Sequence, residues 1–304
     1  MRTIIADLHN HTNQSDGVFT PTQLIEHAKS IGLKCIGVTD HDTIAGIDEA
    51  LSAGKDADIQ VICGTEVSIR CMSELFIGSI HLLLYFSKAL ALNPTFTNEL
   101  ESILQQGRGD SLVRNRIIAI NREFGPDSTI KKLDRPLTEE DIKSYGTNIT
   151  RRHFALALEH KHGITDRSQI DLIIGNNSPA YIPSGIDLEL LLPIIKEYKI
   201  LRVLAHPACG SFPGSNHYKV VYPSIEVMEK LLPDLLHKDK CNINGIEVYY
   251  PAHTDENRFQ LLQWAYKYDL CVTGGSDCHD IEYRPLGIEG VTSEELSIIL
   301  SIIG

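Results

Sequence analysis

The segment Thr3-Ile4-Ile5-Ala6-Asp7-Leu8-His9-Asn10-His11 decides how this chain is interpreted. Its first half is a short apolar run typical of a buried β-strand, and its second half is a His-x-His pair. In an extended segment residues i and i+2 face the same side, so His9 and His11 can hold one metal ion from a single strand end. The segment therefore indicates a metalloenzyme.

The same association of an apolar run with metal-capable side chains recurs along the chain. It appears in Asn13-Gln14-Ser15-Asp16-Gly17, Thr39-Asp40-His41-Asp42, Gly64-Thr65-Glu66, His81, Ala205-His206-Pro207 and Gly275-Ser276-Asp277-Cys278-His279. The candidate metal ligands are His9, His11, Asp16, His41, Glu66, His81, His206, Asp277 and His279. Because this mixed nitrogen and oxygen set contains no cysteine, it suits Mn²⁺, Fe²⁺ or Zn²⁺.

Short apolar runs alternate with helix-like stretches, which predicts an α/β fold with mainly parallel strands. The expected strands are Ile4–Leu8, Cys35–Thr39, Gln60–Cys63, His81–Phe86, Leu201–Ala205, Gly245–Tyr249 and Cys271–Thr273. The expected helices between them are Thr20–Ile31, Thr43–Ala53, Ile186–Tyr198, Ser224–His237 and Asp255–Tyr268. A capping box at Thr292-Ser293-Glu294-Glu295 predicts a closing C-terminal helix.

Most candidate ligands lie at or just beyond the C-terminal end of a predicted strand, and in a closed α/β barrel these ends share one face. Glu66 follows its strand by three residues, whereas His81 begins its strand. The connection between them is too short and polar for a helical crossover, so we expect an antiparallel return that starts at the same rim. On this arrangement all candidate ligands converge on one barrel mouth.

A region without strand patterns separates the two groups of strands. Its expected helices are Asn98–Gln106, Ser111–Phe124, Thr138–Tyr145, Arg151–His160 and Asp166–Ile174. We interpret residues 91–182 as a helical insertion over the mouth, acting as a lid or substrate-binding subdomain. Residues 1–90 and 183–304 then form the metal-binding barrel.

Composition narrows the classes of function. The net charge of −12, from 28 basic and 40 acidic side chains, argues against binding long duplex nucleic acid. The seven cysteines are odd in number and form no C-x-x-C pair, which favours reduced thiols. A signal-peptide pattern and an apolar run of about 20 residues are both missing from the sequence, so we expect a cytoplasmic protein that does not span a membrane.

Seven blocks of the chain together resemble the polymerase-and-histidinol-phosphatase (PHP) family of metal-dependent phosphoesterases. The blocks are DLHNHTNQSDG, GVTDHDTIAG, ICGTEVS, IHLLLYF, VLAHPA, GIEVYYPAHTDE and GGSDCHD. The resemblance implies a distorted seven-stranded (β/α)7 barrel with two to three divalent ions in a trinuclear metal site. It implies that His9, His11, Glu66 and Asp277 hold the first ion, that Asp16, His41 and His279 hold the second, and that Glu66, His81 and His206 hold the third.

Catalytic and substrate-binding residues have weaker patterns. The family often carries arginines in the insertion and a Gly-Arg-Pro-His block, to which Thr150-Arg151-Arg152-His153 is similar. On this basis Arg114 and His153 are expected to act in catalysis and to bind substrate, because an arginine fork fits two phosphate oxygens. His253, beyond another strand end, is a further expected substrate contact. Asp40 is placed in the catalytic set, with Asp40 or Asp42 expected to orient a ligand imidazole.

The expected activity is hydrolysis of a phosphate ester by a metal-bound hydroxide, in the manner of a phosphatase or phosphodiesterase. The expected substrate is a small phosphorylated metabolite or nucleotide, such as a nucleoside 3′,5′-bisphosphate, or a short RNA end. A histidinol-phosphate-type phosphatase is an alternative within the same chemistry. A non-catalytic metal-binding regulatory module and an amidohydrolase are alternatives from other classes, and bridging by Glu66, where amidohydrolases typically use a carboxylated lysine, disfavours the latter.

Overall fold

The computed structural model describes residues 2–214 and 218–304. Its single seven-stranded sheet follows chain order. The strands are β1 (Ala6–Asp7), β2 (Cys35–Val38), β3 (Gln60–Met72), β4 (Ile77–Phe86), β5 (Ile200–Leu204), β6 (Gly245–Tyr249) and β7 (Cys271–Gly274). All neighbours pair in parallel except β4, which is antiparallel to β3 and β5.

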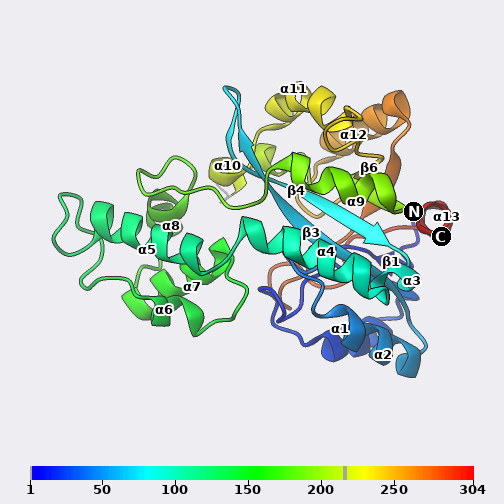
Figure 1. Ribbon diagram of the computed structural model, residues 1–304, viewed down its shortest axis with the longest axis horizontal. Helices are drawn as coiled ribbons and strands as arrows, with labels where there is room; N and C mark the ends of the chain where they lie inside the picture. The colour runs from blue at the N-terminus through cyan, green and yellow to red at the C-terminus, as the bar shows by residue number, and fades with distance from the viewer. Residues whose placement is uncertain (1, 215–217) are drawn as a thin grey trace.

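Backbone hydrogen bonds between the first and last strand ends bring the sheet nearly to closure. The Leu8 amide donates to the Gly274 carbonyl at 3.3 Å, and the His11 amide donates to the Cys278 carbonyl at 2.9 Å. The predicted seven-stranded α/β barrel is therefore confirmed, including the antiparallel return of β4. Figure 1 shows the strands surrounded by helices.

Strands β3 and β4 are longer than their apolar runs predict. Their antiparallel register extends from Cys63 opposite Phe86 to Met72 opposite Ile77, so the hairpin projects well beyond the barrel (Figure 1). Glu66 consequently lies inside β3 and His81 inside β4, and the expectation that they lie outside or at the edge of their strands is wrong. Each strand supplies the other's hydrogen-bond partners, so polar residues can continue the ladder past the apolar core.

Helices cover the outside of the barrel. The larger ones are α1 (Pro21–Ser30), α2 (Ile47–Ala57), α11 (Ile225–Leu236) and α12 (Asp255–Tyr268), with the short α3 (Lys88–Ala91), α9 (Leu192–Glu197) and α10 (Tyr218–Val221) and the 3₁₀ turns Gln105–Gly107, Leu188–Leu191 and Cys209–Ser211. Thr20 caps α1 with a complete capping box, as its sequence predicts. Among the described residues, no helix is both long and apolar enough to cross a membrane.

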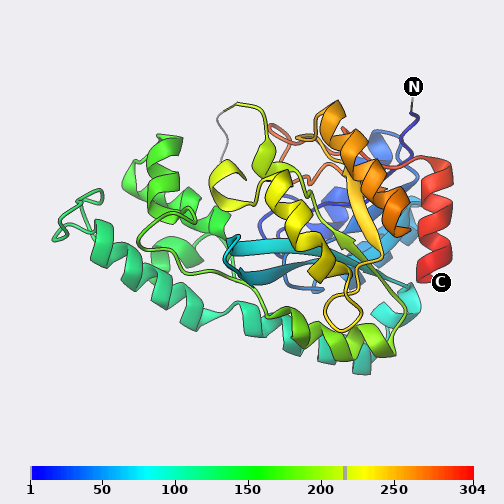
Figure 2. The same ribbon diagram turned by 90° about the horizontal axis from the view of Figure 1, so that it is seen from above.

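The side chains of the barrel strands divide between two hydrophobic cores. Alternation along β4 sends Leu83 and Tyr85 into a core shared with Leu8, while Leu82 and Leu84 belong to a separate core against the outer helices. The C-terminal helix α13 (Ser293–Ile303), capped by Thr292 as expected, contributes to the first core. It lies at the end of the molecule opposite the helical insertion (Figures 1 and 2).

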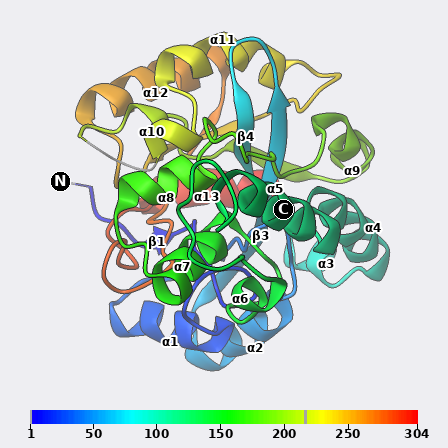
Figure 3. The same ribbon diagram turned by 90° about the vertical axis from the view of Figure 1, so that its left-hand side faces the viewer.

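The insertion contains α5 (Asp110–Phe124), α6 (Glu139–Lys143), α7 (Arg151–His162) and α8 (Arg167–Ile174), which share a hydrophobic core of their own. Figure 3 shows α6, α7 and α8 in front of the barrel end. The preceding helix α4 (Pro94–Leu104) packs Phe96 and Leu100 into the barrel's outer core instead. The boundary at residue 91 stays a prediction, and this packing favours a start after α4.

Candidate metal centre

Glu66, in the middle of β3, lies at the centre of the barrel mouth. Its Oε1 is 2.9 Å from His81 Nδ1 and 2.9 Å from His206 Nε2. Its Oε2 is 3.0 Å from His41 Nδ1 and 3.2 Å from His11 Nε2. His9 Nε2 is also 3.4 Å from Oε2, so each carboxylate oxygen faces a different set of imidazoles, as a bridging ligand would.

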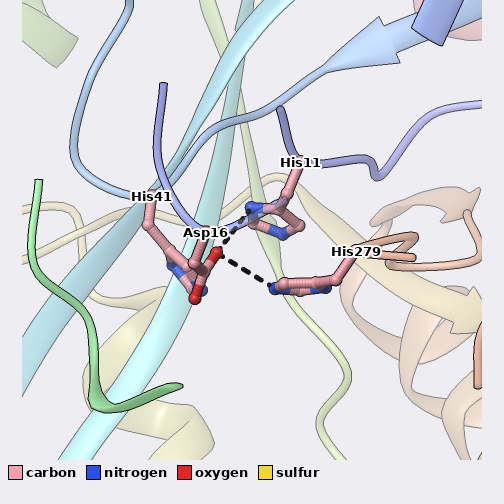
Figure 4. A group of neighbouring side chains, drawn as sticks. All are labelled: His11, Asp16, His41 and His279. Carbon is pink, nitrogen blue, oxygen red and sulfur yellow. Dashed lines mark ion pairs between the residues drawn. The ribbon is translucent and has the colours of Figure 1, made fainter. Parts of the chain in front are cut away.

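The candidate ligands assemble into three overlapping groups in which the ligand atoms lie within 4.8 Å of one another. The groups are His9, His11, Glu66 and Asp277; His11, Asp16, His41 and His279; and His41, Glu66 and His81. Figure 4 shows the second group, where Asp16 Oδ1 is 3.2 Å from His279 Nε2. His206 joins through Glu66 Oε1, so the fold brings all nine sequence-predicted ligands to one site.

Unsatisfied polar atoms in this site test whether it fits metal ions. Within the described part of the chain, the buried ligand atoms without a hydrogen-bond partner are His9 Nε2, His11 Nδ1 and Nε2, Asp16 Oδ1, His41 Nδ1, Glu66 Oε2, His206 Nδ1 and Asp277 Oδ1. Leaving one buried polar group unpaired costs about 1–3 kcal/mol. Divalent ions would satisfy most of these converging nitrogen and oxygen lone pairs at once, so the donor set fits such ions.

Three of the imidazoles are held in the form that binds metal. Burial lowers the pKa of His206 to about 4. Burial, together with the nearby His11, lowers the pKa of His279 to about 4. Burial also holds the pKa of His41 well below its usual range. These rings are neutral at pH 7, so their lone pairs are available to a cation.

The carboxylates are held in their ionised form. Burial alone would raise the pKa of Asp16, but His279 and His41 hold it well below its usual range. Burial would also raise the pKa of Glu66, yet His41 and the other surrounding imidazoles hold it well below its usual range. A buried anion is costly unless cations surround it, and divalent ions would supply that charge.

Glu247, a residue that sequence reasoning missed, supports two of the ligands. Its Oε1 is 3.0 Å from His9 Nδ1, and its Oε2 accepts a hydrogen bond from the His206 amide at 2.7 Å. Burial alone would lower the pKa of His9, but Glu247 and Glu66 raise it to about 10. A carboxylate behind a metal-ligating histidine orients the ring and increases its basicity. A lone acid in the apolar strand β6 was the available clue.

Strained backbone positions cluster at the mouth. Asp42, His206 and Asp277 adopt left-handed conformations with φ of 49°, 31° and 54°. Such conformations cost about 1–3 kcal/mol each for residues other than glycine and collect at functional sites. Gly275 permits close packing next to them, because a Cβ there would lie 2.4 Å from the His9 amide nitrogen. The left-handed backbone therefore lowers the stability of the fold, and in return it directs these side chains.

The hydrogen bonds of Asp40 correct its expected catalytic role. Asp40 accepts from the Thr12 amide at 2.7 Å, the Thr12 hydroxyl at 2.7 Å and the Ser15 hydroxyl at 2.6 Å. Both its oxygens are occupied, so Asp40 shapes the loop that carries Asp16 rather than facing a substrate. Asp42 is engaged by Ser68. The expected role of orienting an imidazole belongs to Glu247 instead.

His253 is likewise a structural residue rather than the expected substrate contact. The residue is 4% exposed, Nδ1 lies 2.9 Å from the Val248 carbonyl, and Nε2 accepts from the Ala208 amide at 3.3 Å. Burial lowers its pKa to about 3, so the ring is neutral at pH 7. With both nitrogens bonded to backbone, His253 holds the loop that follows His206.

The expected role of Arg114 stays a prediction. It is exposed on α5 and acts electrostatically on Asp110. Arg108 lies at the rim, where it donates to Asp42, to the Ser68 hydroxyl at 3.0 Å and to the Ile149 carbonyl at 2.9 Å. Arg108 therefore ties the insertion to the barrel.

His153 lies at the rim as its motif suggests. Its Nδ1 accepts a hydrogen bond from the Thr150 amide at 2.9 Å, which leaves the proton on Nε2. The Thr150 hydroxyl in turn donates to Asp16 Oδ2 at 2.6 Å. Burial lowers the pKa of His153, and the positive charges of Arg108 and Arg152 lower it further. Two guanidinium groups therefore lie near His153 at the rim between insertion and barrel, where Arg108 pairs with Asp42 and Arg152 with Asp280.

A barrel of this type with imidazoles and carboxylates gathered at its mouth defines a metal-dependent hydrolase. Residues 7–106 match the PHP domain. The chain is 27% identical over 277 residues to a 5′-3′ exoribonuclease of Haemophilus influenzae, covering 90% of this chain and 89% of that protein. It is 25% identical over 280 residues to a 3′,5′-nucleoside bisphosphate phosphatase of Chromobacterium violaceum, covering 90% of this chain and 86% of the relative.

Solved structures agree with this likeness. A protein of Bifidobacterium adolescentis assigned as a metal-dependent phosphoesterase superimposes with a TM-score of 0.73 at 27% identity, over 97% of this chain and 95% of that one. Residues 7–106 therefore carry a PHP domain, and the chain is similar to a metal-dependent phosphoesterase over nearly its whole length. It is accordingly a hydrolase that acts on phosphate esters.

Proposed function

We propose that the nine clustered side chains hold two to three divalent ions and that the enzyme hydrolyses a phosphate ester of a nucleoside bisphosphate or of a short RNA end. The unsatisfied buried nitrogen and oxygen atoms around Glu66 carry this proposal. The relatives support the substrate class, since one is named for bisphosphates and another for RNA ends. Mn²⁺, Fe²⁺ and Zn²⁺ all suit the donor set.

Three groups of residues would share the ions. The first is His9, His11, Glu66 and Asp277; the second is Asp16, His41 and His279, with His11 nearby; the third is Glu66, His81 and His206, with His41 nearby. Divalent ions bound there would provide a nucleophile at neutral pH and neutralise negative charge on the phosphoryl oxygens. Glu66, with imidazoles on both oxygens, would be shared between two of the groups.

Residues of the rim would orient the ester over these ions. His153 carries its proton on Nε2, so it can donate to a phosphate or leaving-group oxygen but cannot accept there. Arg108 and Arg152 add positive charge next to it. Because Thr150 also contacts Asp16, binding at this rim places the substrate directly beside the second group of ligands.

The test is hydrolysis by protein stripped with a chelator and then supplied with Mn²⁺, Fe²⁺ or Zn²⁺. The substrates are adenosine 3′,5′-bisphosphate, a 5′-phosphorylated RNA of a few nucleotides, and histidinol phosphate, with an amide substrate for comparison. We expect nucleotide or RNA hydrolysis only after metal is supplied, and a loss of at least about 100-fold for Glu66→Ala. The matched control is Glu226→Ala, which removes an exposed carboxylate on α11.

The alternatives predict different outcomes of the same test. Full activity of Glu66→Ala would refute the bridging role. Preference for histidinol phosphate or for the amide would replace the proposed substrate class. Stoichiometric metal binding without hydrolysis of any of these compounds would identify a metal-binding regulatory module instead.

A further inference from the structure

The loop that follows His279 places Arg284 at the edge of the metal centre. Arg284 Nη1 donates to Asp277 Oδ2, to the Tyr218 hydroxyl at 2.8 Å and to the Tyr250 hydroxyl at 3.1 Å. Its Nη2 lies 3.1 Å from His279 Nδ1. The side chain is only 20% exposed, so this guanidinium is largely enclosed by the site it contacts.

The two oxygens of Asp277 therefore have different surroundings. Oδ1 points into the cluster, 3.0 Å from His11 Nε2 and 3.5 Å from His9 Nε2, and it has no hydrogen-bond partner among the described residues. Oδ2 points outward, where it accepts from Arg284 and from the Tyr250 hydroxyl at 2.9 Å. Only one oxygen is left available to a metal ion.

We propose that Arg284 is a positioning residue that holds Asp277 as a single-oxygen ligand and thereby raises the metal affinity of the group formed by His9, His11, Glu66 and Asp277. This inference rests on the proposed metal site. A planar guanidinium with several donors fixes a carboxylate in one orientation. The ligand is thus preformed before an ion arrives, and the ion does not have to order it.

Charge supports the same role. Asp16, Glu66 and Asp277 bring three carboxylates into one buried site. Arg284 compensates one of these negative charges from outside the cluster, on the oxygen that does not face the imidazoles. It can therefore hold Asp277 in place without occupying the position of an ion.

The loop that carries Arg284 is also fastened to the insertion. Asp280 Oδ1 accepts from the Glu282 amide at 3.1 Å and from the Tyr283 amide at 2.9 Å, which sets the turn. Asp280 Oδ2 accepts from Arg152 Nη2 at 2.8 Å, and Arg152 belongs to α7. The position of the insertion is thereby linked to Asp277 through a single short loop.

The experiment measures Mn²⁺ affinity by calorimetric titration of chelator-stripped, full-length protein. We expect Arg284→Met to weaken binding by about 10–100-fold at one site, as removal of an outer partner of a metal ligand does. Arg284→Lys should recover part of the loss because it keeps the charge. Tyr250→Phe, which removes one hydrogen bond to Oδ2, should show a smaller loss. Arg2→Met is the matched control, since Arg2 pairs with Glu295 outside the site.

A second measurement separates positioning from general damage to the fold. Thermal unfolding in chelator should give similar midpoints for Arg284→Met and Arg2→Met, while only Arg284→Met loses metal affinity. Equal or tighter Mn²⁺ binding by Arg284→Met, or a loss no larger than that of Arg2→Met, would overturn the inference. If the unaltered protein binds no Mn²⁺, the proposed function fails rather than the role of Arg284.

Discussion

The barrel mouth and the helical insertion follow opposite rules of packing. At the mouth, imidazoles and carboxylates are buried with unsatisfied atoms and left-handed backbone at His206 and Asp277. In the insertion, apolar side chains such as Phe154 and Ile173 fill a core, and the ion pair of Arg135 with Asp141 lies near the surface. The mouth gives up stability to prearrange ligands, whereas the insertion obtains stability from ordinary burial.

The largest expected effect is on the barrel mouth, where bound metal ions should supply the stabilisation that packing does not provide. Addition of Mn²⁺ to stripped protein should raise the free energy of unfolding by about 4 kcal/mol for each ion when the free ion is 1,000-fold above its dissociation constant. Differential scanning calorimetry with and without Mn²⁺ measures this. Glu66→Gln should remove most of the response, and an unchanged response in that variant would contradict the contrast between the two regions.

An intermediate effect is expected from the core of the insertion. Ile173→Ala should destabilise the protein by about 2–5 kcal/mol, because Ile173 is fully buried and its loss leaves a cavity. Leu172→Ala is the neighbouring control, since Leu172 is 43% exposed. Urea unfolding measures both variants. Mn²⁺ affinity should stay within about twofold in each, and a parallel loss of affinity in Ile173→Ala would show that the regions are not independent.

The smallest expected effect concerns the ion pair of the insertion between the exposed Arg135 and the mostly buried Asp141. Arg135 first, and then the Thr138 contacts, lower the pKa of Asp141 below its ordinary value of 3.8. A lowered folded-state pKa stabilises the fold above the unfolded pKa, and this contribution disappears as the pH falls below about 4. Asp141→Asn should therefore cost about 1 kcal/mol or less at pH 7 and nothing in strong acid. Unfolding at several pH values, with exposed Asp134→Asn as control, checks this sign.

Local sequence patterns were sufficient to predict the features whose chemistry follows directly from the spacing of residues. The His9-x-His11 pair and the acids and imidazoles near strand ends predicted the barrel mouth, because parallel strands present these ends on one face. The start of α2 was less predictable. It begins at Ile47 rather than near Thr43, because His41 and Asp42 are held against β3 by the Glu66 carbonyl.

The sequence by itself determined the ligand types, their order and the strands that deliver them, since apolar runs and capping residues act over a few neighbouring positions. Only the tertiary structure decided the roles of the residues around them. Glu247 and Arg284 became partners of the ligands, while hydrogen bonds engage Asp40 and His253 in structural positions. The reason is physical: a side chain's role depends on which atoms occupy its hydrogen bonds, and those atoms come from segments far away in the chain.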